Sequence, residues 1–227
     1  LSVHVINERN PFPTVIVRIC PRPCENDCRR QLVDEPVAIN FLKRFVADWE
    51  MSEEREPIEA IPQTRAQNVA VIGAGPCGLT AAKDLVTLGY GVTVFESLPV
   101  AGGMLRVGVP EYRLPGAIVD REVQDIVDLG VDLRLNTTVD DLDGLFEQGY
   151  EAVLIAVGAH EGKKLPIPGA DLPEVLVNTR FLRDVRLAEL GPEHDVGALH
   201  QRIEGRRVLV LGGGNVAIDC ARTAVRL

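Results

Sequence analysis

A continuous apolar run that ends in glycines is the clearest hydrophobic pattern in the chain. Residues 69–72 are Val-Ala-Val-Ile, a run typical of a strand that is buried on both faces of a parallel sheet. Apolar residues then recur at helical spacing from Leu79 to Val86 and stop before Gly89. Residues 91–95 have the pattern of a second strand. Strand, glycine turn, helix and strand in this order predict an α/β fold with a Rossmann-like parallel sheet.

The same kind of pattern predicts the other elements. Downstream we expect a helix over 118–127 closed by Gly130, a strand over 131–135, a polar segment over 140–148, a buried strand over 152–158 and a helix over 179–190. Upstream, residues 1–33 look irregular. A helix is predicted from Asp34 to Trp49, with Asp34 as its cap and Pro36 in its first turn. Its apolar stripe would consist of Ala38, Leu42, Phe45 and Trp49.

The turn after the first strand has the spacing of a dinucleotide-binding loop, Gly-Ala-Gly-Pro-Cys-Gly. Its three glycines would allow a sharp turn, a close approach to a pyrophosphate and tight packing of helix on strand. The helix N-terminus adds free N–H groups and partial positive charge. An acidic residue at the end of the second strand, Glu96, can accept hydrogen bonds from a ribose. The alternative is a glycine-rich turn without a ligand. The expected pyrophosphate contacts are Gly73, Ala74, Gly75, Pro76, Cys77 and Gly78.

Three further glycine features could lie against a cofactor. Gly102 and Gly103 form a second turn, which lets backbone lie against a flat or charged ligand. Gly158 ends the strand predicted over 152–158, where backbone could close over the cofactor. Arg113 follows in the loop after the second turn and could pair with a phosphate, although an ordinary surface arginine is the alternative.

A second unit of the same kind begins near the end of the chain. The apolar run over 208–211 leads into Gly212, Gly213 and Gly214, and a helix is predicted to follow. Two such beginnings fit an enzyme that holds two dinucleotides, one flavin and one nicotinamide. A complete βαβ unit needs about 30 residues, and about 20 remain from the start of this run. We therefore expect the polypeptide to continue elsewhere or to be a fragment.

Three cysteines with three residues between each pair stand in a proline-containing loop: Cys20, Cys24 and Cys28. Thiolates at this spacing suit an iron–sulfur cluster or another soft metal site. A cluster takes four ligands and this loop has three, so zinc with His4 as an outside ligand and three free thiols remain alternatives. The predicted organisation is a helical iron–sulfur-type module with a linker over 1–67, a dinucleotide-binding domain over 68–204 and the start of a second over 205–227.

Composition narrows the functional classes. The net charge of −9, from 24 basic and 33 acidic residues, opposes binding to a nucleic acid backbone. No apolar run is long enough to span a bilayer, and the first residues lack the layout of a signal peptide. Five cysteines are an odd number in a chain too large to need disulfide staples. These features predict a cytoplasmic protein without membrane or nucleic acid partners.

Several of these stretches together resemble a known family. They are residues 20–28, Glu-Pro-Val-Ala-Ile at 35–39, residues 71–76, Gly-Gly-Met-Leu-Arg at 102–106, Pro-Glu-Tyr-Arg-Leu-Pro at 110–115 and Gly-Gly-Gly-Asn-Val-Ala-Ile-Asp at 212–219. In this order they resemble the small (beta) subunit of NADPH-dependent glutamate synthase. They resemble equally the iron–sulfur flavoproteins attached to formate dehydrogenases and hydrogenases, and the N-terminal half of dihydropyrimidine dehydrogenase. The chain looks like an N-terminal portion of such a protein.

The resemblance implies FAD at the first unit, NAD(P)H at the second and [4Fe–4S] clusters in the N-terminal module, with Cys20, Cys24 and Cys28 as ligands. Hydride would pass from the nicotinamide to the flavin, and electrons would leave through clusters to a partner subunit. No side chain would need to act as acid or base. A non-catalytic electron-relay or assembly module of a larger complex is the alternative. The implied cofactor contacts also include Glu96, Gly102, Gly103, Met104, Arg113, Val139, Gly213, Gly214, Asn215 and Val216.

Overall fold

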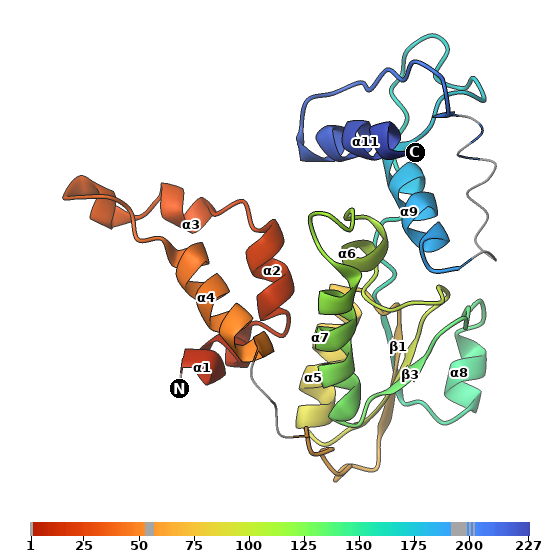
Figure 1. Ribbon diagram of the computed structural model, residues 1–227. Helices are drawn as coiled ribbons and strands as arrows, with labels where there is room; N and C mark the ends of the chain where they lie inside the picture. Colours follow the sequence, from red (N-terminus) through yellow and green to blue (C-terminus); the bar gives the residue numbers. More distant parts are fainter. Residues whose placement is uncertain (1, 53–56, 192–198, 200, 202) are drawn as a thin grey trace.

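The structure, a computed structural model, describes residues 2–52, 57–191, 199, 201 and 203–227. It contains a four-stranded sheet, which Figure 1 shows nearly edge-on. Its strands are β1 (Asn68–Ile72), β2 (Gly91–Phe95), β3 (Asp132–Arg134) and β4 (Ala152–Ile155). The Rossmann-like fold expected from the sequence is thereby confirmed.

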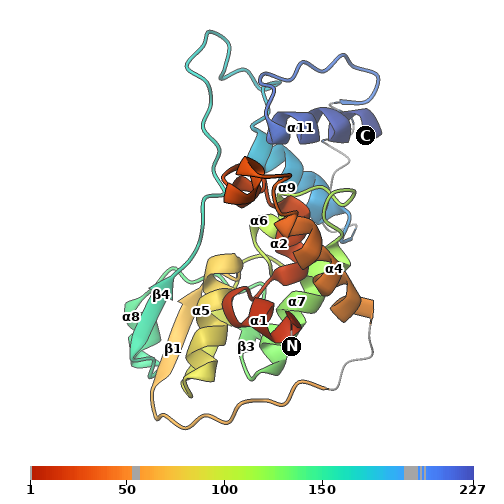
Figure 2. The ribbon, with the colours of Figure 1, turned by 90° about the vertical axis from the view of Figure 1, so that its left-hand side faces the viewer.

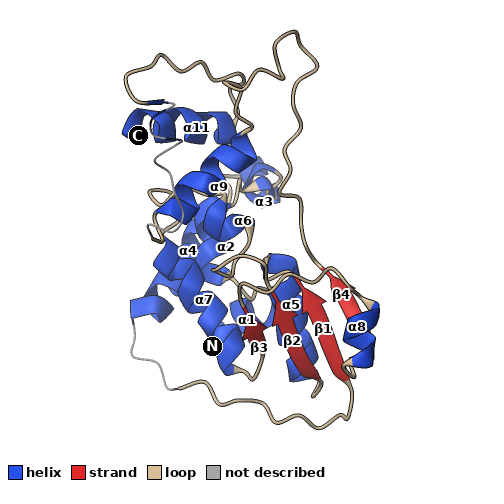
Figure 3. Cartoon of the chain, turned by 90° about the vertical axis from the view of Figure 1, so that its right-hand side faces the viewer, coloured by secondary structure: helices blue, strands red, loops and turns tan. Residues whose placement is uncertain are grey.

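All pairs in the sheet are parallel, and the strand order is β3-β2-β1-β4. Val71 of β1 lies between Val94 of β2 and Leu154 of β4 (Figure 3). The strand order reverses between β1 and β4, because the chain first adds strands on one side of β1 and then returns to the other. In open α/β sheets, ligands bind beyond the carboxyl ends of the strands at such a reversal. The glycine turn after β1 lies at this point.

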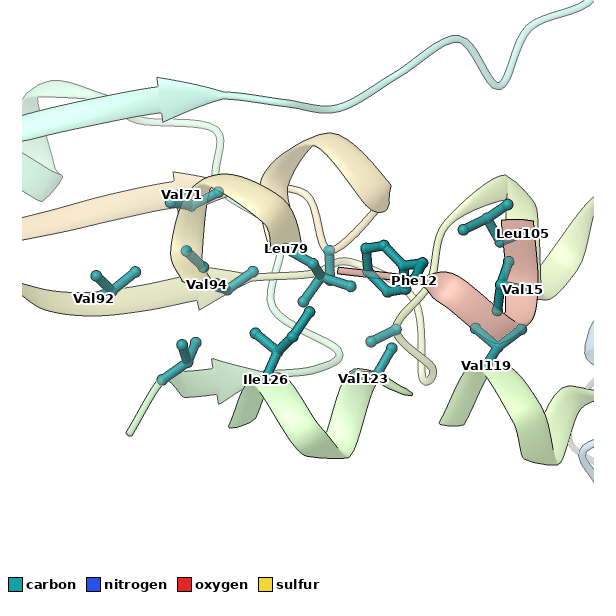
Figure 4. Close-up of a cluster of buried hydrophobic side chains, with 14 of the residues drawn as sticks. Phe12, Val15, Val71, Leu79, Val92, Val94, Leu105, Val119, Val123 and Ile126 are labelled. Carbon is teal, nitrogen blue, oxygen red and sulfur yellow. The ribbon is translucent and has the colours of Figure 1, made fainter. Parts of the chain in front are cut away.

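Helices cover both faces of the sheet. α5 (Pro76–Thr87) and α7 (Gly116–Asp128) lie on one face, and the short α8 (Asp143–Glu147) lies on the other (Figure 1). The main core joins Val71 and Val94 of the sheet to Leu79 of α5 and Ile126 of α7 (Figure 4). A smaller core on the opposite face consists of Ala70, Phe95 and Leu145.

The N-terminal segment is helical, so the expectation that residues 1–33 are irregular was wrong. It contains α1 (Ser2–Arg9), α2 (Pro13–Ile19), α3 (Pro23–Asn26) and the 3₁₀ helix η1 (Arg29–Leu32). Proline is the first residue of both α2 and α3, a position where its missing N–H is not needed. Of these helices, α2 packs on α7, on the side of that helix away from the sheet (Figure 2).

The next helix, α4 (Ile39–Ser52), differs from its prediction at both its start and its buried face. Asp34 does not cap it and instead pairs with Arg30 at 2.9 Å. Asn40 and Ala47 are the buried positions, whereas Trp49 of the expected apolar stripe is 52% exposed. The buried Asn40 amide donates to the Val17 carbonyl oxygen at 2.9 Å, which turns this polar face toward α2.

Two further expectations were wrong in the second half of the chain. β4 is an edge strand, and its Ile155 side chain is largely exposed rather than buried. Residues 208–211 form no strand, and Leu209 is 83% exposed because no strand pairs with this segment. The helices expected on either side do form, as α9 (Asn178–Ala188) and α11 (Asn215–Arg226). Within the described residues, no helix combines the length and apolar character needed to cross a membrane.

Candidate functional site

The first glycine turn has free space beside one of its three glycines and is tightly packed beside the other two. A Cβ on Gly73, whose φ is +105°, would lie 2.5 Å from the Ala156 carbonyl oxygen of the strand end opposite. A Cβ on Gly78 would lie 2.0 Å from the Gly73 carbonyl oxygen, so this glycine allows α5 to pack on the turn. A Cβ on Gly75 would meet only Gly103 Cα, at 4.0 Å. Protein packing therefore does not require a glycine at position 75.

The N-terminus of α5 faces the same space. Gly75 is its N-cap residue, and no side chain caps the helix there. Pro76 has no N–H, so the Cys77 and Gly78 N–H groups are the first of the helix itself, and Cys77 is exposed. Uncapped N–H groups and the helix dipole together favour an anion. The turn therefore combines free space at Gly75 with uncapped helix donors, two features that favour a phosphate group.

The second turn packs backbone against backbone on the first. Gly103 has φ +53°, and a Cβ there would lie 2.8 Å from Gly75 Cα. Gly102, with φ +105°, donates its N–H to the Ala74 carbonyl oxygen at 2.7 Å. Met104 begins the short helix α6 (Met104–Val107) directly after these glycines. Gly102 and Gly103 thus lie beside the first turn, and Met104 follows them in the chain.

Glu96 follows β2 and reaches back across the first turn. Its buried carboxylate accepts the Ala74 N–H at 2.8 Å through Oε2 and the Leu98 N–H at 2.9 Å through Oε1. The sequence predicts a ribose acceptor at this position. In the structure the same carboxylate also binds the backbone of the first turn and of the segment after β2. Oε1 also accepts the Ser97 hydroxyl at 3.3 Å, whereas Oε2 keeps a second acceptor position that fits a ribose hydroxyl.

The remaining predicted contacts are more dispersed. Val139 is half-buried and packs on the small core beneath β1 and β2. Gly158, with φ +66°, is exposed beyond β4, and nothing lies within 4 Å of its Cβ position. The Arg113 guanidinium points to α11, where it pairs with Asp219 at 2.8 Å. The sequence does not reveal that pair, because 106 positions separate its members.

The glycine turn before α11 repeats the backbone of the first. Gly212 has φ +119°, close to Gly73, and the N-cap Gly214 has φ −77° and ψ 175°, against −79° and 178° for Gly75. A Cβ on Gly213 or Gly214 would meet nothing within 4 Å. Asn215 and Val216 open the helix without a side-chain cap. This turn therefore presents a second uncapped helix N-terminus with free volume.

The three cysteines of the N-terminal loop are free thiols in two kinds of environment. Cys24 is exposed, whereas Cys20 and Cys28 are half-buried and accept N–H groups of Arg22 at 3.4 Å and Val37 at 3.5 Å. The Val37 and Arg30 backbone hydrogen bonds lower the pKa of the Cys28 thiol. Across the described side chains, no three Cys, His, Asp or Glu groups converge on a metal position. As placed, the loop does not fit a cluster, and the His4 side chain lies outside the described residues.

Glu25, beside Cys24, has a role that sequence reasoning missed. Its carboxylate accepts the Asn40 N–H at 2.7 Å and so caps α4 from a separate helix. We expect Glu25→Ala to destabilise the N-terminal module by about 1 kcal/mol, since a helix N-terminus loses its cap. Denaturant unfolding followed by fluorescence of Trp49, the only tryptophan, would measure this. An unchanged midpoint would show that the cap contributes nothing.

Comparison with known proteins places the chain in a family. The pattern of the pyridine nucleotide-disulphide oxidoreductases matches residues 67–227, which include both glycine turns. The chain belongs to the pyridine nucleotide-disulphide oxidoreductase family. Residues 1–55 match a second pattern, the 4Fe-4S cluster domain II of dihydropyrimidine dehydrogenase. The chain thus matches the oxidoreductase family over residues 67–227 and the domain II pattern over residues 1–55. This agrees with the resemblance found in the sequence.

Individual relatives include subunits of several enzymes. The NADP(+)-dependent formate dehydrogenase subunit beta of Moorella thermoacetica is 42% identical, over 99% of this chain and 34% of that protein. The subunit PreT of the NAD-dependent dihydropyrimidine dehydrogenase of Escherichia coli is 35% identical, over 98% of this chain and 52% of its own. The glutamate synthase [NADH] of Saccharomyces cerevisiae is 33% identical, over 100% of this chain and 10% of its own. The chain spans about a third of the length of the first curated relatives.

A solved structure shares the fold. A 2-naphthoyl-CoA reductase superposes with a TM-score of 0.52 at 24% identity, over 74% of this chain and 23% of its own. At this identity the likeness concerns the fold alone.

Proposed function

We propose that this chain is the N-terminal part of an FAD-dependent NAD(P)H oxidoreductase subunit of the glutamate synthase small-subunit type. Two glycine turns with the same backbone geometry are the observation that carries this proposal. The first lies where the strand order reverses, the preferred ligand position of such sheets. Relatives named as beta subunits of a formate dehydrogenase and of an NADPH-Fe(3+) oxidoreductase support a subunit of this kind.

In this proposal each turn holds one dinucleotide. Gly73 to Gly78 would receive the FAD pyrophosphate, Glu96 its ribose, and Gly102 to Met104 the flavin side, with Arg113 and Val139 as further contacts and Gly158 closing over the cofactor. Gly213 to Val216 would receive NAD(P)H. When bound, FAD would supply hydride acceptance from the nicotinamide and single-electron transfer onward. The chain's own contribution is to bind and orient the two cofactors, because no described side chain needs to move a proton.

The electron acceptor in this proposal is a partner subunit, as the subunit names of the relatives suggest. A [4Fe–4S] carrier in the N-terminal module stays a prediction. The match of residues 1–55 favours it, whereas the described thiols do not converge. We therefore assign no electron step to a cluster in this chain.

The absorption spectrum of the whole native polypeptide tests the proposal. We expect a structured flavin spectrum after incubation with FAD, and bleaching of that spectrum by NADPH or NADH without oxygen. A protein that stays colourless with FAD contradicts the proposal. A flavin spectrum indifferent to both nucleotides would instead identify an electron-relay or assembly module. Broad brown absorbance would identify a cluster.

The variant Gly214→Ala separates the two sites in the same assay. Its φ is ordinary and nothing lies near its Cβ position, so alanine fits the fold. We expect it to slow bleaching at low nucleotide concentration on the order of tenfold, because the added methyl group occupies the phosphate space. The flavin spectrum before reduction should stay that of the wild type. An unchanged bleaching rate would argue against nucleotide binding at this turn.

A further inference from the structure

Asp219 is a buried carboxylate that joins the second glycine unit to the loop after α6. It lies on α11, five positions beyond Gly214, and its side chain is 7% exposed. Its Oδ1 accepts the Tyr112 hydroxyl at 2.9 Å and lies 2.8 Å from Arg113 Nη2. Desolvation offsets most of the attraction within a buried ion pair, so such a pair is weak evidence for a stabilising role. It lies on the helix that follows the second turn and pairs with the loop that follows α6, and this link between the two units points to another role.

Three cations lie around Asp219 and Tyr112, the residue that donates its hydroxyl to this carboxylate. The guanidinium groups of Arg222 and Arg226 lie 4.3 and 4.5 Å from the centroid of the Tyr112 ring, and Arg113 is a third cation beside it. Burial and the hydrogen bond to Asp219 raise the pKa of Tyr112, so its hydroxyl stays a donor at neutral pH. Asp219 is therefore the anion that offsets the charge of Arg113.

The loop that carries Arg113 is anchored in the main core of the sheet domain. Leu114 next to it is fully buried in the main core, and the Arg113 N–H donates to the Pro110 carbonyl oxygen at 3.0 Å. The loop follows α6, which begins directly after Gly103, and Gly103 touches Gly75. The Arg113 side chain remains 30% exposed. One side of the guanidinium is thus held by Asp219, and part of it stays accessible to a ligand.

We propose that Asp219 is a positioning residue for Arg113: it holds the guanidinium and offsets its charge, and thereby sets how strongly that charge acts on FAD at the first turn. The inference rests on the proposed function, in which Arg113 contacts FAD. Charge near a flavin tunes its electronics. A cation favours reduced FAD, which is the more negative form, and a carboxylate paired with that cation weakens the effect.

Redox titration of the FAD-loaded protein tests this inference. Asp219→Asn keeps the side-chain volume and an acceptor oxygen for Tyr112 but removes the charge. We expect it to tighten binding of reduced FAD relative to oxidised FAD about tenfold, which is about 30 mV toward positive potential for a two-electron couple. Asp171→Asn is the matched control, because it removes the same charge from the exposed pair with Lys164. It should leave the potential unchanged.

The Arg113→Gln background distinguishes positioning from a structural role. If Asp219 acts through Arg113, the shift caused by Asp219→Asn disappears in this background, as a coupled pair requires. A shift that persists there overturns the inference, and so does a D219N potential equal to that of D171N. In both cases FAD binds and the proposed function stands. A wild-type protein that binds no FAD overturns the proposed function together with this inference.

Discussion

Replacing Gly75 by alanine should weaken FAD binding on the order of a hundredfold while the fold of the apoprotein survives. The structure gives this position an ordinary extended backbone, with φ −79° and ψ 178°, and a Cβ there would only touch Gly103 Cα at 4.0 Å. Alanine therefore fits the protein. It does not fit a pyrophosphate that lies close to the backbone, because the methyl group would occupy the approach path.

Titration of apoprotein with FAD, followed by the quenching of flavin fluorescence, would measure the change in affinity. Thermal unfolding of the apoprotein gives the control, and we expect a change within about 1 kcal/mol from the poorer N-cap. Gly78→Ala is the matched variant, for which we expect the opposite result in the thermal unfolding of the apoprotein. Its Cβ would lie 2.0 Å from the Gly73 carbonyl oxygen, so it should destabilise the fold itself. Wild-type FAD affinity in Gly75→Ala would contradict the assignment of this turn.

The sheet and both glycine turns could be predicted because their signals are local. A short apolar run next to a glycine turn and an amphipathic helix leaves few other arrangements. The same rule failed at residues 208–211, which have an equally apolar pattern. A strand needs a neighbour that accepts its hydrogen bonds, and the described part of the chain offers none there. An apolar pattern indicates that a segment can form a strand, but the strand forms only where a neighbouring strand pairs with it.

The N-terminal module is helical, as predicted, but the details predicted within it failed for a different reason. Proline suggested irregular structure before α2 and α3, yet in both it is the first helical residue. Glu25, and not the nearby Asp34, caps α4. The hydrogen bond from the Asn40 amide to the Val17 carbonyl oxygen determines which face of α4 is buried. These contacts join residues 15 and 23 positions apart. No periodicity within a single helix could reveal them.

The apolar stripe expected on α4 instead remains on the surface. Its members Ala38, Leu42, Phe45 and Trp49 are all exposed, as is the neighbouring Phe41, while the polar Asn40 is buried. The apolar contact between the module and the sheet domain is therefore made through α2 and the residue before it. Phe12 enters the main core beside Leu79 and Val123, and Val15 lies beside Leu105 and Val119 (Figure 4). A single buried carboxylate, Glu122 of α7, completes this contact.

Glu122→Ala should destabilise the docked N-terminal module by about 2–4 kcal/mol, the largest stability effect that we expect. The carboxylate accepts the Thr14 N–H at 2.6 Å and the Val15 N–H at 3.2 Å, and all three groups are buried. Removal would leave two buried donors at the start of α2 without a partner. Denaturant unfolding monitored by Trp49 fluorescence, compared with far-ultraviolet circular dichroism, would measure the loss for the module and for the sheet domain.

Glu151→Ala is the matched control for this prediction. Glu151 also accepts a backbone N–H, from Asn68 at 2.7 Å, but this bond is exposed. Water can replace an exposed acceptor, so the variant should lose no more than about 0.5 kcal/mol. Equal losses in the two variants would show that burial of the Glu122 contact is unimportant.

The Glu122 contact should also make the stability of the protein depend on pH. Burial raises the pKa of Glu122, and hydrogen bonds from Thr14 and Val15 offset only part of that rise. The folded state therefore takes up this proton more readily than the unfolded state, whose carboxyl has a pKa near 4.5. The contribution of this protonation to the free energy of unfolding is complete below the unfolded pKa. It is lost as the pH rises through the folded pKa. Wild type should gain stability over the non-titrating Glu122→Gln as the pH is lowered from 7 toward 5. A difference that is constant, or that grows with pH, would refute this account of how the module is docked.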